Sequence, residues 1–120
     1  MKLYTFPLGA DGLVSGPRKT LIDFGEEDGI DGMCVDVMGN LYMAVRSVKR
    51  PGVWVADPSG KELAYIPTAA SQADVKEPKG IPANVTFGLG DESKVLYVTV
   101  DQSLYRIRLK IDGWHIPFEK

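Results

Sequence analysis

Short apolar segments recur in this chain at an interval of roughly fifty residues, and this repeat limits the folds that the chain can adopt. The complete repeat holds four segments rich in β-branched and aromatic residues, and no convincing helical pattern lies between them. Three segments of one repeat have counterparts in the next: 33–35 with 84–86, 41–45 (LYMAV) with 96–100 (LYVTV), and 53–55 with 104–106. Four antiparallel strands at this period predict an all-β fold, the β-propeller, with a sandwich or barrel of about nine or ten strands as the alternative.

Turn residues divide the chain into the predicted strands. Two hairpins follow one another and predict a four-stranded antiparallel meander: 32–37 with 41–46 around MGN, and 52–56 with 62–66 around DPSGK. Further strands are predicted at 3–6, 20–24, 84–87, 94–100 and 103–109. The polar stretch 67–82 is predicted to be a long loop, and residues 110–120 show no clear period.

These strands predict a single partial propeller domain over residues 1–120. Residues 1–24 form the end of a preceding blade, residues 32–67 a complete four-stranded blade, and residues 84–109 three strands of the last blade. Because propellers close with about four to eight blades, the sequence predicts a propeller fragment or a subunit of an assembly. Open blades expose strand edges and apolar faces, so self-association through these edges is expected.

The composition excludes some classes of partner. The chain is 44% hydrophobic and 25% charged, with a formal net charge of -2, so it lacks the basic field with which proteins bind nucleic acid. No apolar run is long enough to cross a membrane, and no membrane partner is expected. The expected location is cytoplasmic by default, or periplasmic or secreted if a leader precedes this sequence. Cys34 is the single cysteine, which rules out an intrachain disulfide and favours a buried, inert thiol.

Several motifs, taken in order, give the chain a family resemblance. They are DGMCVDVMGNLYMAV (31–45), GVWVADPSGK (52–61), PANVTFG (82–88), LYVTV (96–100) and SLYRI (103–107). Over nearly its whole length the chain resembles the gluconolactonase and regucalcin (senescence marker protein) family. The resemblance implies a six-bladed propeller, of which this chain is the C-terminal portion. It also implies a last blade that needs a strand from the N-terminal part of the propeller to close.

The same resemblance implies a function. Members of the family bind one divalent cation in the central tunnel, Ca²⁺ most often with Zn²⁺, Mg²⁺ or Mn²⁺ as alternatives, and hydrolyse sugar-acid lactones or related esters. Of the family's metal ligands, only the Asp of a Pro-Asp-Gly-Met segment falls within this chain. It corresponds to Asp31, which is therefore the candidate metal ligand and catalytic residue. Ile30 stands where the family commonly has proline, and the remaining ligands, a Glu and one or two Asn of other blades, have no counterparts here.

Two side chains are predicted to face the central channel. The first strand of a blade is its innermost, so a residue in the loop just before it points at the channel, where oxygen ligands from several blades can converge on a cation. Asp31 is predicted to lie in such a loop, and Asn84 in the equivalent loop of the next blade. Each has a structural alternative, because Asp and Asn also shape turns. A single Asp cannot supply the roughly six to eight oxygen ligands of Ca²⁺.

Two functions therefore remain open. The first is a metal-dependent hydrolase of sugar-acid lactones, a small-molecule substrate class, whose active site needs further blades. The second is a non-catalytic truncated propeller, or an interaction module that uses its exposed strand edges.

Overall fold

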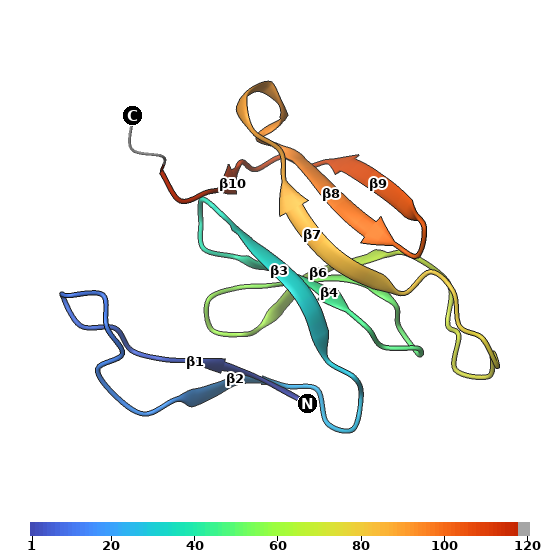
Figure 1. The fold of residues 1–120 in the computed structure, drawn as a ribbon, viewed down its shortest axis with the longest axis horizontal. Coiled ribbons are helices and arrows are strands. Elements are labelled where there is room, and N and C mark those ends of the chain that lie inside the picture. The colour runs from blue at the N-terminus through green and yellow to red at the C-terminus, as the bar shows by residue number, and fades with distance from the viewer. Residues whose placement is uncertain (118–120) are drawn as a thin grey trace.

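The computed structural model describes residues 1–117, which form ten β-strands and one turn of 3₁₀ helix at Gly90–Glu92 (Figure 1). The strands are β1 (Lys2–Thr5), β2 (Lys19–Asp23), β3 (Ile30–Asp36), β4 (Leu41–Val45), β5 (Gly52–Ala56), β6 (Glu62–Pro67), β7 (Pro82–Phe87), β8 (Val95–Val100), β9 (Ser103–Arg108) and β10 (Gly113–Trp114). They form three antiparallel sheets, with strand orders β1-β2, β10-β3-β4-β5-β6 and β7-β8-β9. No helix in this part of the chain is long and apolar enough to cross a membrane.

Strands β3 to β6 form the four-stranded meander that the sequence predicts. Strands that are neighbours in the chain are neighbours in this sheet, and β4 and β5 are its two central strands. Every residue of β4 except Leu41 is buried, and every residue of β5 except Trp54. Because successive side chains of a strand point to opposite faces, this burial shows that both faces of the sheet are covered.

Each face of the meander packs against a different sheet, which gives three layers (Figure 1). On one face, Tyr42, Ala44, Val53 and Val55 pack against Val85, Phe87, Leu96, Val98 and Val100 of the β7–β9 sheet. On the other face, Met43, Val45 and Ala56 pack against Leu3, Ile22 and Phe24 of the β1–β2 segment. The meander is therefore the middle layer, with a partial sheet on either side.

The two hairpins of the meander close through the same five-residue turn, Asp-x-x-Gly-x, at residues 36–40 and 57–61. In both turns the Asp N–H donates to the carbonyl of the fifth residue, and the Gly N–H donates to the Asp carbonyl. The Asp Oδ1 accepts the backbone N–H groups of the third and fifth residues. Gly39 and Gly60 have φ of 80° and 87°, the left-handed region in which glycine carries no steric penalty.

Burial distinguishes the first of these turns from the second. Asp36 is 1% exposed, and its Oδ2 accepts hydrogen bonds from Asn40 Nδ2 at 2.9 Å and from the Tyr42 hydroxyl at 3.2 Å. Asp57 lies at the surface, where its Oδ1 also accepts from the Ser59 hydroxyl at 2.6 Å. Asp36 is therefore a buried carboxylate whose two oxygens are both satisfied within the hairpin.

Three strands hold the same place in three successive layers: β1, β5 and β9. Each carries an aliphatic residue followed by an aromatic one: Leu3-Tyr4, Val53-Trp54 and Leu104-Tyr105. β2 pairs with β1 as its outer neighbour, and β6 pairs with β5 in the same way. Within residues 1–117 no strand pairs with the outer edge of β9, and all six of its residues are exposed.

The segment after β9 returns to the inner strand of the meander. Its two-residue strand β10 pairs with β3, with Trp114 opposite Val35. The sequence showed no period over residues 110–120 because a strand of two residues carries no alternation to detect. Residues 118–120 lie outside the described residues.

Candidate channel site

Asp31 is the second residue of β3, whereas the sequence placed it in a loop before the strand. The pairing of β3 with β4 shifts register between Ile30 and Met33, which marks a β-bulge. β3 therefore begins at Ile30, before the bulge, and its regular pairing with β4 resumes at Met33. Asp31 lies within the bulge. Its side chain is about half exposed, at 51%.

Asn84 lies near the start of the first strand of the next sheet, where the strand register matches it to Gly32. It belongs to β7, which includes the predicted strand 84–87, and not to a loop before that strand; the pairing of β7 with β8 shifts register between Pro82 and Asn84. The Asn84 N–H donates to the Thr99 hydroxyl at 2.9 Å, and its Oδ1 accepts the Val85 N–H at 2.8 Å. Asp31 and Asn84 thus occupy bulges at the start of two adjacent inner strands, and both are exposed.

Gly32 brings these two bulges together. A Cβ at this position would overlap the Asn84 amide and would lie 2.9 Å from the Asn84 Cα. Only a residue without a side chain lets β3 and β7 approach so closely. The glycine of the Asp-Gly pair therefore holds the backbone next to Asp31 against Asn84.

Arg46 is the nearest charge to the Asp31 carboxylate. It follows β4, and its Nη1 lies 3.3 Å from Asp31 Oδ2. The Arg46 N–H also donates to the Gly29 carbonyl at 2.9 Å, which fixes the backbone beside the start of β3. Both side chains of the ion pair are about half exposed, so the pair contributes little stability and can exchange with solvent ions. The sequence analysis missed Arg46, because its place opposite Asp31 depends on the register of β3 with β4.

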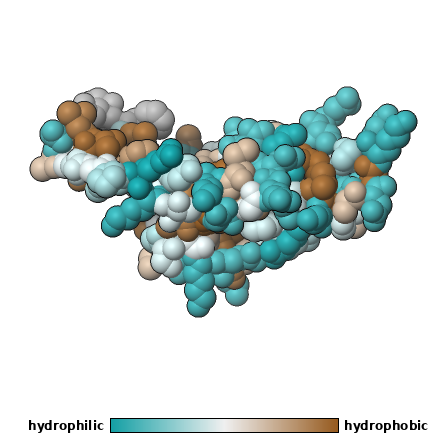
Figure 2. All heavy atoms as spheres, turned by 90° about the horizontal axis from the view of Figure 1, so that it is seen from below, coloured by the Kyte–Doolittle hydropathy of each residue, from teal (hydrophilic) through white to brown (hydrophobic). Residues whose placement is uncertain are grey.

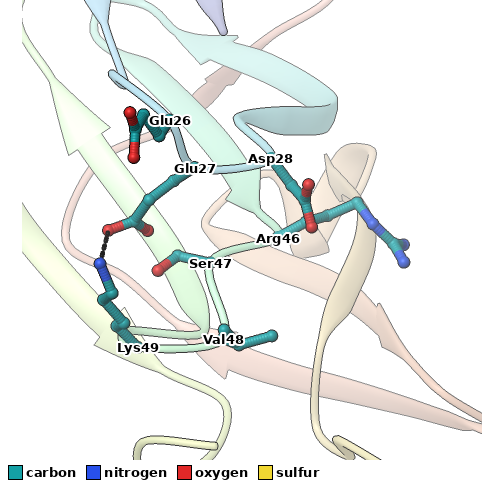
Figure 3. A pocket seen from close by; sticks show the side chains of 7 residues that line it. All are labelled: Glu26, Glu27, Asp28, Arg46, Ser47, Val48 and Lys49. Atoms are coloured by element: carbon teal, nitrogen blue, oxygen red, sulfur yellow. Dashed lines mark ion pairs between the residues drawn. The ribbon is translucent and has the colours of Figure 1, made fainter. Parts of the chain in front are cut away.

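A pocket of about 270 Å³ includes Arg46 in its lining (Figure 3). Its lining consists of Glu26, Glu27, Asp28, Arg46, Ser47, Val48 and Lys49. Lys49 Nζ lies 3.9 Å from Glu27 Oε1, while the Arg46 guanidinium points away from both (Figure 3). Glu27 Oε2 is buried and has no hydrogen-bond partner within residues 1–117. Arg46 and Lys49 line the same pocket as the acidic residues 26–28. These carboxylates alone therefore do not make the pocket a cation site.

The described residues hold no group of three or more His, Cys, Asp or Glu side chains that could bind a metal ion. Asp31 supplies one carboxylate and Asn84 one amide, whereas Ca²⁺ takes about six to eight oxygen ligands. Their chemistry fits a hard cation, because both are oxygen donors. Within residues 1–117, Asp31 and Asn84 alone supply fewer donors than such a cation takes.

Cys34 lies on β3 and packs against the core between the meander and the β7–β9 sheet. It is half-buried, where the sequence predicted a buried thiol. Burial raises the pKa of the Cys34 thiol to about 11. The thiol is therefore un-ionised near neutral pH and does not serve as a nucleophile.

The sequence profile of the SMP-30/gluconolactonase/LRE-like region matches residues 1–102. The chain belongs to this family. An X-ray structure from a structural genomics consortium, of a protein named provisionally as a gluconolactonase, is similar over 96% of this chain at 26% identity, with a TM-score of 0.65. Among curated proteins, none matches the chain significantly.

This SMP-30/gluconolactonase-like chain spans about a third of its solved relative, because it covers 34% of that protein. The three layers are therefore a fragment of a β-propeller: one complete blade, β3–β6, with parts of two neighbouring blades. The predicted fold class is confirmed, and the sandwich and barrel alternatives are wrong. β3 and β7 are the first strands of the complete blade and of the partial blade that follows it, and Asp31 and Asn84 lie near the start of each.

Proposed function

We propose that this chain carries part of the channel site of a metal-dependent hydrolase of sugar-acid lactones. The observation that supports this most is a shared arrangement: Asp31 and Asn84 are exposed oxygen-bearing side chains beside the register shifts at the start of β3 and β7. Gly32 holds the two bulges in contact. An oxygen-bearing side chain on each inner strand is the arrangement from which a ring of blades builds a cation site. Membership of the gluconolactonase-like family supports the same substrate class.

Asp31 has one of two roles in this proposal. As a ligand, its carboxylate holds a divalent cation, for which we favour Ca²⁺ over Zn²⁺, Mg²⁺ or Mn²⁺ because the available donors are oxygens. A bound cation would polarise the lactone carbonyl and stabilise the developing negative charge. As a general base, the Asp31 carboxylate accepts a proton from the water that attacks the carbonyl carbon. Asn84 orients the substrate or adds an amide oxygen to the ligand set.

The alternative is a non-catalytic propeller fragment or interaction module. The Asp31–Arg46 ion pair favours it for the isolated chain, because the guanidinium occupies the charge position that a cation would take. The two functions make different predictions: the hydrolase requires that a metal ion can displace Arg46 from the Asp31 carboxylate, and the non-catalytic fragment does not.

Calcium titration by calorimetry tests this proposal. We expect one-site binding that Asp31→Asn abolishes and that Arg46→Gln strengthens roughly tenfold, since removal of the guanidinium removes a competing cation. Asp91→Asn, which changes an exposed carboxylate in the 3₁₀ turn, is the matched control and leaves binding unchanged. Lactone hydrolysis measured on the same variants should follow the order of metal affinity. No calcium binding to either the native chain or Arg46→Gln would sink the hydrolase proposal for this chain.

A further inference from the structure

The backbone of Arg46 is held beside Gly29, between two aspartates of the same segment. The Arg46 N–H donates to the Gly29 carbonyl at 2.9 Å. Asp28 directly precedes this glycine in the chain, and Asp31 follows it by two residues. The Arg46 side chain is long and has many rotamers. It therefore has a carboxylate on either side of the point at which its backbone is fixed.

The contact between Arg46 and Asp31 is loose. It runs through one guanidinium nitrogen, Nη1, which lies 3.3 Å from Asp31 Oδ2. Arg50, four residues later in the chain, instead makes two hydrogen bonds to the Glu62 carboxylate at 2.6 and 2.9 Å. Two parallel bonds hold a guanidinium more firmly than one long bond between exposed groups. The Arg46 side chain is therefore free to exchange Asp31 for another carboxylate.

The pocket in Figure 3 offers such carboxylates. Its lining includes Glu26, Glu27 and Asp28, and besides Arg46 itself the lining holds one cation, Lys49. Lys49 Nζ lies 3.9 Å from one Glu27 oxygen, and the other Glu27 oxygen is buried without a hydrogen-bond partner within residues 1–117. The pocket therefore carries an excess of negative charge, which attracts a second cationic side chain.

Exchange between the two sides of Gly29 requires no burial of charge. Figure 2 views the molecule from the side on which the loop before β3 projects in Figure 1, and most of the surface in this view is hydrophilic. The side chains of Arg46 and Asp31 are 45% and 51% exposed, and Asp28 is also exposed. Exposed side chains change rotamer within picoseconds to nanoseconds. The guanidinium can therefore change partners while it stays in water.

We propose that Arg46 is a two-position side chain that couples the Asp31 carboxylate to the acidic pocket. In one position its guanidinium pairs with Asp31. In the other position, which a divalent cation on the Asp31 carboxylate favours, it pairs with Asp28. The role of the cation rests on the metal-dependent function proposed above, whereas the two positions are a property of the chain alone.

Asp28 is then a positioning residue that acts on the cation through Arg46. A guanidinium with a second partner leaves Asp31 more readily, so the apparent affinity of Asp31 for the cation rises. Because such coupling is reciprocal, a cation on Asp31 strengthens the pair of Arg46 with Asp28 by the same factor. The modest strength of ion pairs between exposed side chains limits this factor to roughly two- to fivefold.

Calcium titration by calorimetry tests the coupling. Asp28→Asn should weaken calcium binding roughly two- to fivefold in the native chain and leave it unchanged in an Arg46→Gln background. Glu26→Gln is the matched control, because it removes a carboxylate of the same pocket that lies away from Arg46 (Figure 3), and it should leave the affinity unchanged. If Asp28→Asn weakened binding equally with and without Arg46, the lost charge would act directly on the cation, which overturns the coupling.

Nuclear magnetic resonance of the isotope-labelled chain tests the second position without metal. The Arg46 Nε–H signal is assigned by its loss in Arg46→Gln. Asp31→Asn removes the first partner and should move this signal. In the Asp31→Asn background, Asp28→Asn should move the signal again, whereas Asp28→Asn alone should move it far less, since Arg46 then still has Asp31. Glu26→Gln in the Asp31→Asn background is the control and should leave the signal in place.

The two measurements separate a failed hydrolase from a failed exchange of partners. An Arg46 signal that ignores Asp28→Asn in the Asp31→Asn background overturns the second position. A signal that responds supports it even where no variant binds calcium, a result that removes the hydrolase alone. Calcium binding that requires Asp31 but is indifferent to Asp28 supports the hydrolase and overturns the coupling.

Discussion

At the scale of single residues, Arg50 shows how an exposed side chain can be fixed by several weak contacts at once. Its guanidinium makes two hydrogen bonds to the Glu62 carboxylate, at 2.6 and 2.9 Å. The same group lies 4.1 Å from the Tyr65 ring centroid and 4.8 Å from that of Trp54. The fork geometry suits a carboxylate, and the flat cation suits an aromatic face. Arg50 thereby connects β5 to β6 on the outer side of the blade.

The Glu62 carboxylate should make stability depend on pH. Its hydrogen bonds to Arg50 lower the pKa of Glu62 below its ordinary value of 4.5. A carboxyl whose folded pKa is lowered stabilises the protein above the unfolded pKa, and this contribution disappears as pH falls through the folded pKa. Because both side chains are 41% exposed, we expect Glu62→Gln to cost at most about 1 kcal/mol at neutral pH.

Urea denaturation of the native chain and Glu62→Gln at neutral pH and near pH 3 measures this difference. The difference in free energy of unfolding between the native chain and Glu62→Gln should be smaller at the lower pH. The control is Glu77→Gln in the exposed loop before β7, which should show no gap at either pH. A gap for Glu62→Gln that stayed constant with pH would exclude the ion pair as its cause.

At the scale of elements, the two Asp-x-x-Gly-x turns use one geometry in two environments. Both Asp side chains accept the same pair of backbone N–H groups. Only Asp36 is buried, where it also accepts the Tyr42 hydroxyl. A hydrogen-bond donor left without an acceptor in the core costs more free energy than one that water can reach. Loss of the aspartate side chain should therefore destabilise the first turn more than the second.

We expect Asp36→Ala to lower the free energy of unfolding by about 3 kcal/mol, since it leaves the Tyr42 hydroxyl and two backbone N–H groups without their acceptor. Asp57→Ala removes the equivalent bonds at the surface and should cost clearly less. Chemical denaturation of both variants provides the comparison, each serving as the other's control. Equal losses would show that the turn geometry, and not burial, determines the contribution of the aspartate.

At the scale of the whole molecule, stability depends on contacts between blades as much as on the blades themselves. The complete blade buries both of its faces against partial neighbours. The Tyr42 and Phe87 rings meet edge to face across one of these interfaces, with centroids 5.0 Å apart. Toward the channel, the same two blades meet at Gly32 and Asn84. At this junction β3 and β7 approach closely, with room for no Cβ at position 32.

Gly32→Ala should force these strands apart, because the added Cβ overlaps the Asn84 amide. Overpacking of this kind typically costs about 1–3 kcal/mol. The same change in an Asn84→Ala background should cost less, because the obstructing amide is gone. A double-mutant cycle measured by denaturation gives the coupling between the two positions, and additive losses would contradict direct contact.

The sequence predicted the blade but not the geometry of its channel end. Turn residues such as Gly39 and Gly60 and the alternation of the strands are local signals, so the meander could be predicted from them. The family resemblance came from the ordered sequence motifs and not from these signals. The bulges at Asp31 and Asn84 depend on pairing with β4 and β8, and no local pattern marks them. For the same reason the Asp31–Arg46 ion pair was invisible, since it joins residues that only the register brings together.

The paired aspartate turns have a kinetic consequence. Each closes a hairpin whose strands are neighbours in the chain, so it forms without the loss of entropy that closing a long loop requires. Hairpins of this kind form within about 1–10 μs, far faster than contacts between distant segments. A refolding chain should therefore acquire its central blade first, and the β1–β2 segment and the β7–β9 sheet then dock onto a surface that already exists.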